Sequence, residues 1–119
     1  MADQRITDLS YLEDMGMGDD SLLIEMIQLF LDNTPESLRL MKEHEANNDW
    51  EKLSAEAHKL KPNLSYMGLN GAREIILDIE ESVKDEAGLD AISGQIRELE
   101  TICRKAYTEL SERLDELQG

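Results

Sequence analysis

His58 and Lys61 are the two side chains of this sequence whose types and spacing most directly suggest chemistry. They lie in the segment Trp50–Leu69, whose apolar residues recur at steps of three and four and predict one buried stripe of an amphipathic helix. At about 100° per residue, His58 falls roughly 130° from the centre of that stripe, so its ring is expected to project into solvent. Lys61, three residues further on, is its neighbour on the helix surface.

An exposed imidazole beside a lysine is suited to carrying a phosphoryl group. Imidazole, with an ordinary pKa of about 6.5, has a free lone pair in most molecules at neutral pH. A lysine on its flexible stem can follow the added negative charge without clamping it. Because phosphoryl transfer depends mainly on positioning and charge stabilisation, such a helix can leave metal and carboxylates to a partner protein. An ordinary exposed histidine and a solvated lysine are the alternatives.

His58, Leu60 and Lys61, followed by Gly68 ten residues after the histidine, resemble the motif of the histidine phosphotransfer (HPt) domain family. The resemblance extends upstream to residues 30–38 and 48–50 and covers roughly residues 9–117 of a single domain, 1–119. It implies that His58 accepts a phosphoryl group from a receiver-domain aspartate and passes it to another receiver. Lys61 would then balance the phosphoryl charge, and Gly68 would keep the partner-facing end of the helix narrow.

Pro62 departs from the family pattern, which usually has glycine directly after the lysine. Its missing N–H removes the hydrogen bond to the carbonyl of residue 58, and an interior proline costs about 3 kcal/mol. Either Pro62, like glycine, presents no long side chain to a docking partner, or it is a tolerated kink. Both interpretations stay open from the sequence.

The surroundings of His58 add further expectations. Ser65 is a small neighbour, and Lys59 is expected to be a surface residue that tunes potential or binding. Glu80 and Glu81 are expected to border the active face, where relatives often have an amide, and an acid there would disfavour a phosphoryl group. His44 is expected only to complement the negative end of its helix. A docking patch is expected near these apolar residues: Leu12, Met67 and Leu69.

Composition indicates an all-α fold. Aromatic residues make up only 4% of the 119 residues, and leucine, isoleucine and methionine supply the apolar positions. Apolar spacing and capping residues predict a short N-terminal helix over residues 9–14 and four substantial helices over about 20–46, 50–67, 70–84 and 89–117, the last being the longest. Asn33–Pro35 marks a break or kink in the first of these, and Asn70 is the expected cap of the third. Short connections predict an antiparallel four-helix bundle.

The formal charge of −15 argues against nucleic-acid binding and against anionic membrane surfaces. Cys103 is the single cysteine, which allows no internal disulfide, and its place on an apolar stripe predicts burial. No signal peptide or membrane span is evident, so a cytoplasmic protein is expected. The expected oligomeric state is a monomer.

Two other classes of function remain open. One is a helical adaptor that docks receiver or kinase domains without carrying phosphate, and the pairing of His58 with Lys61 speaks against it. The other is a metal–carboxylate bundle, which lacks the Glu-x-x-His pairs that such sites need on core positions. No nucleotide-binding or triad signature is visible, so we expect a phosphoryl carrier that is not an enzyme and holds no cofactor, with Mg²⁺ on the partner receiver.

Overall fold

Five α-helices and one short 3₁₀ helix account for most of residues 5–119, the part of the chain that the computed structural model describes. No strand occurs among these residues, so the predicted all-α fold is confirmed. In chain order the elements are α1 (Ser10–Gly16), α2 (Asp20–Ala46), α3 (Trp50–Tyr66), α4 (Asn70–Asp85), η1 (Leu89–Ala91) and α5 (Ile92–Gln118).

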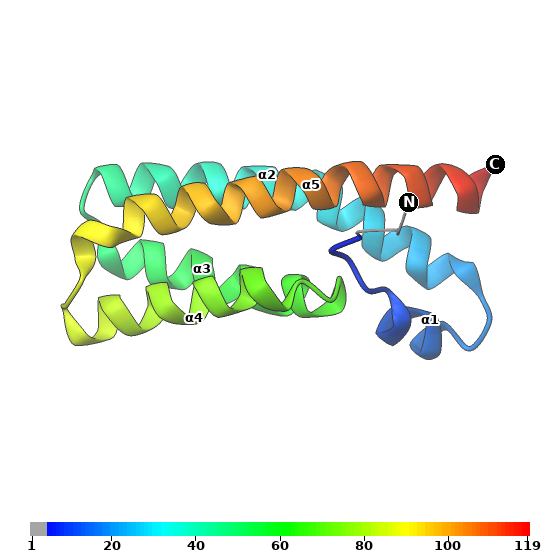
Figure 1. The fold of residues 1–119 in the computed structure, drawn as a ribbon, viewed down its shortest axis with the longest axis horizontal. Coiled ribbons are helices and arrows are strands. Elements are labelled where there is room, and N and C mark those ends of the chain that lie inside the picture. The colour runs from blue at the N-terminus through cyan, green and yellow to red at the C-terminus, as the bar shows by residue number, and fades with distance from the viewer. Residues whose placement is uncertain (1–4) are drawn as a thin grey trace.

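Helices α2 to α5 form an antiparallel four-helix bundle, as predicted. Each helix contacts the next along the chain, and α5 returns to pack against α2, which closes the ring. Figure 1 shows the chain direction reversing between consecutive helices of the bundle, with α1 folded against the N-terminal part of α2. The short connections between the helices leave no other arrangement for neighbouring elements.

Aspartate caps fix two of the helix starts at the predicted places. The Asp19 side chain accepts a hydrogen bond from the backbone N–H of Ser21, and the Asp49 side chain accepts one from Lys52. The expected cap at Asn70 is wrong, because Leu69 occupies the N-cap of α4 and Asn70 is already the first helical residue. α5 also begins later than expected, since a 3₁₀ turn precedes Ile92.

α2 passes through Pro35 without a break. It runs over 27 residues, which equals the length of α5, so the expectation of one longest C-terminal helix is wrong. Figure 1 shows the N-terminal part of α2 inclined to the remainder of the helix, which fits a kink and not an interruption. Phe30, Leu38 and Met41 are all buried, so packing on both sides of the proline keeps the helix intact.

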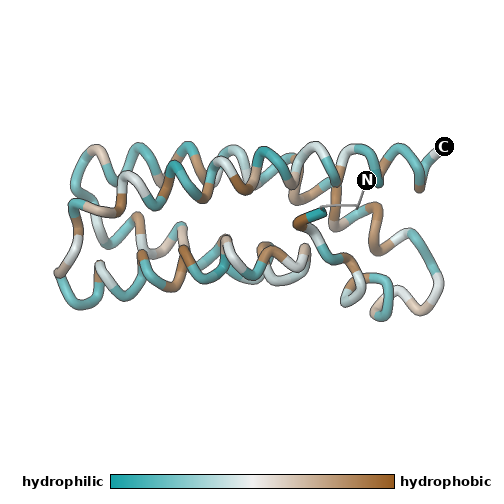
Figure 2. The backbone as a smooth tube through the Cα atoms, viewed as in Figure 1, coloured by the Kyte–Doolittle hydropathy of each residue, from teal (hydrophilic) through white to brown (hydrophobic). Residues whose placement is uncertain are grey.

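The core runs the length of the bundle and draws on every α-helix. Figure 2 shows apolar segments recurring along each of them, as the three-four spacing predicted. The side of α3 that enters this core consists of Leu53, Ala57, Leu60 and Leu64, none more than 1% exposed. Cys103 is fully buried in α5, again as predicted. One side of α3 is therefore anchored, and the opposite side faces solvent.

Candidate functional site

His58 projects from the solvent side of α3. Its side chain is 71% exposed, whereas its neighbours Ala57 and Leu60 are buried in the core. The outward direction expected from the helical periodicity is thus confirmed. Because the buried stripe fixes the rotation of α3, the core sets the direction in which the His58 side chain leaves the helix.

Glu80 of α4 lies against both His58 and Lys61. One carboxylate oxygen, Oε2, is 3.1 Å from Nδ1 of His58, and the other, Oε1, accepts a hydrogen bond of 2.9 Å from Nζ of Lys61. The Lys61 and Glu80 side chains are only 22% and 21% exposed. One carboxylate therefore joins the imidazole and the ammonium group into a single cluster.

This contact distinguishes the two ring nitrogens of His58. A carboxylate oxygen can only accept a hydrogen bond, so the arrangement requires a proton on Nδ1. In the neutral ring the lone pair is then on Nε2, which becomes the nitrogen available for reaction. The geometry favours nucleophilic attack by Nε2.

Lys59, which follows His58 directly, is not part of this cluster. Its side chain is 74% exposed, and Nζ lies 3.8 Å from a carboxylate oxygen of Glu56. Glu81 also lies elsewhere, because it lines a hollow together with Asp78 and Gln95 of α5. Glu80 and Glu81 were both expected to border the active face, and of these two only Glu80 contacts His58 and Lys61.

A shallow hollow beside the imidazole carries more negative charge. It lies between α3 and the C-terminal half of α4, and its lining includes Glu51, Glu80 and Glu86. The remaining lining residues are Trp50, Ser54, Ala55, His58 and Val83. An anion that approaches the ring would meet this acidic rim on one side.

Pro62 and Ser65 lie on the exposed surface of α3 beyond the histidine. α3 continues through Pro62 to Tyr66, so the proline does not end the helix. The Ser65 hydroxyl donates a hydrogen bond of 3.4 Å to the carbonyl of Lys61. Neither residue puts a long side chain on this face, which leaves it open to a docking surface.

Gly68 has a different environment from the one expected. It adopts φ +70°, and a Cβ added there would lie 2.5 Å from Cβ of Asp8 and 2.6 Å from its carbonyl oxygen. The backbone N–H of Asp8 donates to the carbonyl of Met67 at 2.9 Å. Gly68 therefore admits the N-terminal segment to the end of α3, and its expected role of narrowing a partner-facing surface has no support in these contacts.

The apolar residues near which a docking patch was expected are themselves buried. Leu12, Met67 and Leu69 are at most 2% exposed, so a partner would have to contact other side chains near them. The large apolar side chains that are exposed are Tyr11, Met15, Met17 and Leu29. The Tyr11 ring stacks on that of Tyr66, with the ring centroids 5.9 Å apart.

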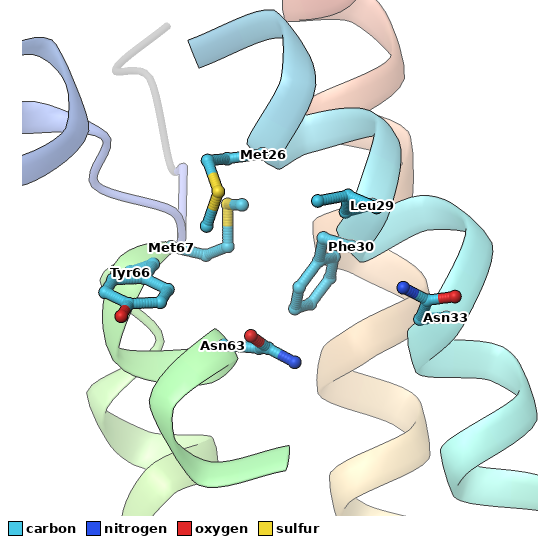
Figure 3. Close-up of a pocket in the computed structure, with 7 residues that line it drawn as sticks. All are labelled: Met26, Leu29, Phe30, Asn33, Asn63, Tyr66 and Met67. Carbon is cyan, nitrogen blue, oxygen red and sulfur yellow. The ribbon is translucent and has the colours of Figure 1, made fainter. Parts of the chain in front are cut away.

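A partly apolar pocket lies between α2 and the C-terminal end of α3. Figure 3 shows the Phe30 ring at its centre, Met26 and Met67 together on one side, and the amides of Asn33 and Asn63 at the opposite end. Leu29 and Tyr66 complete the lining. Asn63 and Tyr66 follow His58 on the same helix by five and eight residues. The pocket therefore lies about one to two helical turns from the histidine and is separate from the His58–Glu80–Lys61 cluster.

Within residues 5–119 no group of three or more histidine, cysteine or acidic side chains is arranged to hold a metal ion. None of the helices in that same range has both the length and the apolar character needed to cross a membrane. His44 lies in the last turn of α2, the position from which it was expected to complement the negative end of the helix.

Three comparisons bear on these observations. The family model described as "Hpt domain" matches residues 25–119. The fold is similar to the crystal structure of the HPT domain from the Hpt sensor hybrid histidine kinase from Shewanella, with a TM-score of 0.80 and 20% sequence identity. That match covers 96% of this chain and 97% of the other. Comparison with curated proteins gives no match.

Proposed function

This chain belongs to the Hpt domain family, whose members have a phosphotransfer role in phosphorelays, and on that premise we propose that His58 is its phosphoryl carrier. The proposed reaction takes a phosphoryl group from the phosphoaspartate of one receiver domain and delivers it to the aspartate of a second. The phosphoryl group enters from a partner protein, because nothing in the sequence resembles a nucleotide-binding motif.

One observation supports this proposal above all others. Of the chain's two histidines, His58 alone has an exposed ring beside a lysine, with Nδ1 engaged by a carboxylate and Nε2 left for reaction. His44 is less exposed and sits at a helix end. The site thus has one nucleophile, one cation and one group that orients the ring.

The transfer step follows from this geometry. The Nε2 lone pair of His58 attacks the phosphorus of the acyl phosphate in line with the P–O bond to the aspartate. That bond breaks, its electron pair stays on the aspartate carboxylate, and a P–N bond forms. Lys61 offsets charge on the phosphoryl oxygens, and Mg²⁺ on the receiver supplies the rest of the charge stabilisation. The contribution of this chain is to present the imidazole in the correct orientation.

We place the receiver over the pocket between α2 and α3 as well as over His58. A typical interface covers about 800 Å² on each partner, which corresponds to a disc of roughly 16 Å radius. Tyr66 is eight residues beyond His58, or about 12 Å along the helix axis. Tyr66 also lies about 80° further around the helix than His58, and a receiver of this width centred on His58 can reach it. An apolar side chain of the receiver can then enter the pocket beside the exposed Leu29.

A transfer assay tests the proposed function. A receiver domain labelled with ³²P on its aspartate is incubated with the purified protein, and acid-labile, alkali-stable label on the protein is measured. The label is expected on the wild type and on His44→Ala, which is the matched control, and it is expected to be absent from His58→Ala. Lys61→Ala is expected to slow transfer about fivefold, the effect of losing a charge contact of ~1 kcal/mol.

The adaptor alternative makes the opposite prediction in the same assay. A protein that only docks receivers would bind them without acquiring label, and His58→Ala would bind as well as the wild type. Label that persists on His58→Ala would move the phosphorylation site to another residue.

A further inference from the structure

The Glu80 carboxylate lies next to Nδ1 of His58, where its negative charge favours a proton on that nitrogen. Its carboxylate oxygens contact Nδ1 of His58 at 3.1 Å and Nζ of Lys61 at 2.9 Å. Two further acids line the same hollow: Glu86, which directly follows α4, and Glu51 of α3. Lys61 places a positive charge against Glu80, and Glu51 and Glu86 add negative charge beside the ring.

Resting on the proposed function, we infer that Glu80 is a positioning residue that holds a proton on Nδ1 of His58 throughout the transfer cycle. The phosphorylated ring is then an imidazolium paired with the Glu80 carboxylate. In this state Nε2 carries the phosphoryl group and Nδ1 keeps its hydrogen. The same carboxylate that orients the free ring also stabilises the positive charge that the ring acquires on phosphorylation.

The atoms and charges of the cycle balance without any proton exchange. When Nε2 of the neutral ring bonds to phosphorus, the Nδ1 hydrogen remains and the ring gains one positive charge. When an aspartate oxygen of the second receiver attacks the phosphorus, the P–N bond breaks and its electron pair returns to Nε2. The leaving group is a neutral imidazole, and the ring is again ready to accept.

Loss of the Nδ1 proton would slow the departure of the phosphoryl group from His58. The phosphorylated ring would be neutral, and breaking its P–N bond would expel an imidazolide anion unless a proton was supplied first. Such a group transfers and hydrolyses more slowly. Glu80 therefore keeps the phosphoryl group labile, and its negative charge also disfavours long storage of a dianion beside it. A neutral amide at this position would not enforce the proton, because an amide can donate as well as accept.

The test uses a chemical phosphoryl donor, so it does not depend on any receiver. Phosphoramidate phosphorylates the ¹⁵N-histidine-labelled wild type and the Glu80→Gln variant, and the ring ¹⁵N chemical shifts report the protonation of Nδ1 at pH 7.5. Glu81→Gln is the matched control, because that acid is on the same helix but lines a hollow facing α5. In the wild type and the control, Nδ1 is expected to remain protonated before and after phosphorylation. In Glu80→Gln it is expected to lose the proton on phosphorylation.

The lifetime of the phosphoryl group provides a second readout. Phospho-His58 is expected to hydrolyse about two- to fivefold more slowly in Glu80→Gln than in the wild type, the effect of one partly exposed ion pair. A deprotonated Nδ1 in the phosphorylated wild type, or equal lifetimes in the two proteins, would overturn the inference. If the proton is retained but no receiver takes the group, the inference stands and the proposed relay function fails.

Discussion

Gly68 lies directly against the backbone of Asp8, sixty residues earlier in the chain. The space at Gly68 is too small for any Cβ, since a Cβ there would be 2.5 Å from Cβ of Asp8. The contact joins the N-terminal segment to the end of the helix that carries His58. The need for glycine at position 68 is thus explained by packing within the chain. From the sequence, Gly68 had been expected to keep a partner-facing surface narrow.

Gly68→Ala is expected to destabilise the protein by about 2–4 kcal/mol, from the positive φ and the clash with Asp8 together. Urea unfolding followed by circular dichroism measures the effect. Gly71→Ala is the matched control: a Cβ at Gly71 meets nothing within 4 Å, and the residue lies in the first turn of α4. The control is expected to be neutral or slightly stabilising. Equal stability of Gly68→Ala and the wild type would contradict the packing role of Gly68.

Leu29→Glu is expected to weaken receiver binding at least about tenfold, because it puts a charge beside the apolar pocket that a partner side chain would enter. Leu29 is 47% exposed, so the stability of the free protein should change little. Titration calorimetry with a receiver domain measures the affinity. Thr101→Glu adds the same charge to an exposed position of α5 and should leave binding unchanged. Equal losses in the two variants would point to net charge and away from the pocket.

Cys103 is expected to be inert towards thiol reagents in the folded protein. Burial, together with the nearby Glu100, raises the pKa of its thiol to about 12, and no part of the side chain reaches solvent. At pH 8 the native protein should react with a disulfide reagent roughly a hundredfold more slowly than the urea-unfolded chain. Labelling of the native protein as fast as the unfolded one would show that α5 is not packed as described.

Glu109 links the N-terminal segment to α5 and gives a pH-dependent contribution to stability. Partial burial acts to raise the pKa of Glu109, but hydrogen bonds from the backbone of Ile6 and from the Thr7 backbone and hydroxyl outweigh it and hold the pKa below its ordinary value. A carboxyl group whose pKa is lowered by folding stabilises the protein above its ordinary pKa. That stabilisation is lost as the pH falls through the lowered value.

Glu109→Gln is therefore expected to cost about 1–2 kcal/mol at pH 7 and progressively less as the pH falls below the ordinary glutamate value of 4.5. Thermal unfolding at pH 7 and pH 3 measures the difference. Glu112→Gln, an exposed acid on the same helix, provides the baseline. A stability difference that does not change between the two pH values would argue against an ionised Glu109 in these contacts.

Helix positions and the direction of His58 could be predicted from the sequence because both depend on local periodicity. The stripe through Leu53, Ala57, Leu60 and Leu64 determines which side of α3 is buried, and the exposed imidazole follows from it. Within α2 the local signal at Pro35 suggested at most a break or kink, and packing on both sides kept the helix continuous.

Contacts between distant segments could not be predicted in the same way. Glu80 and Glu81 are adjacent in sequence, and only the rotation of α4 against α3 decides that Glu80 reaches His58. The burial of Leu12 and Met67, near which a docking patch was expected, also depends on packing that no local pattern specifies. The role of Gly68 likewise depends on residue 8.

The central claim, that His58 carries the phosphoryl group on Nε2, is tested most directly by locating the group after transfer from a phosphorylated receiver. Two-dimensional NMR of the ¹⁵N-histidine-labelled protein resolves both histidines and detects the one-bond coupling between phosphorus and nitrogen. This coupling is expected at Nε2 of His58, and the spectrum of His44 is expected to be unchanged. Coupling at Nδ1, phosphorylation of His44, or label that appears with no change in the His58 ring would contradict it.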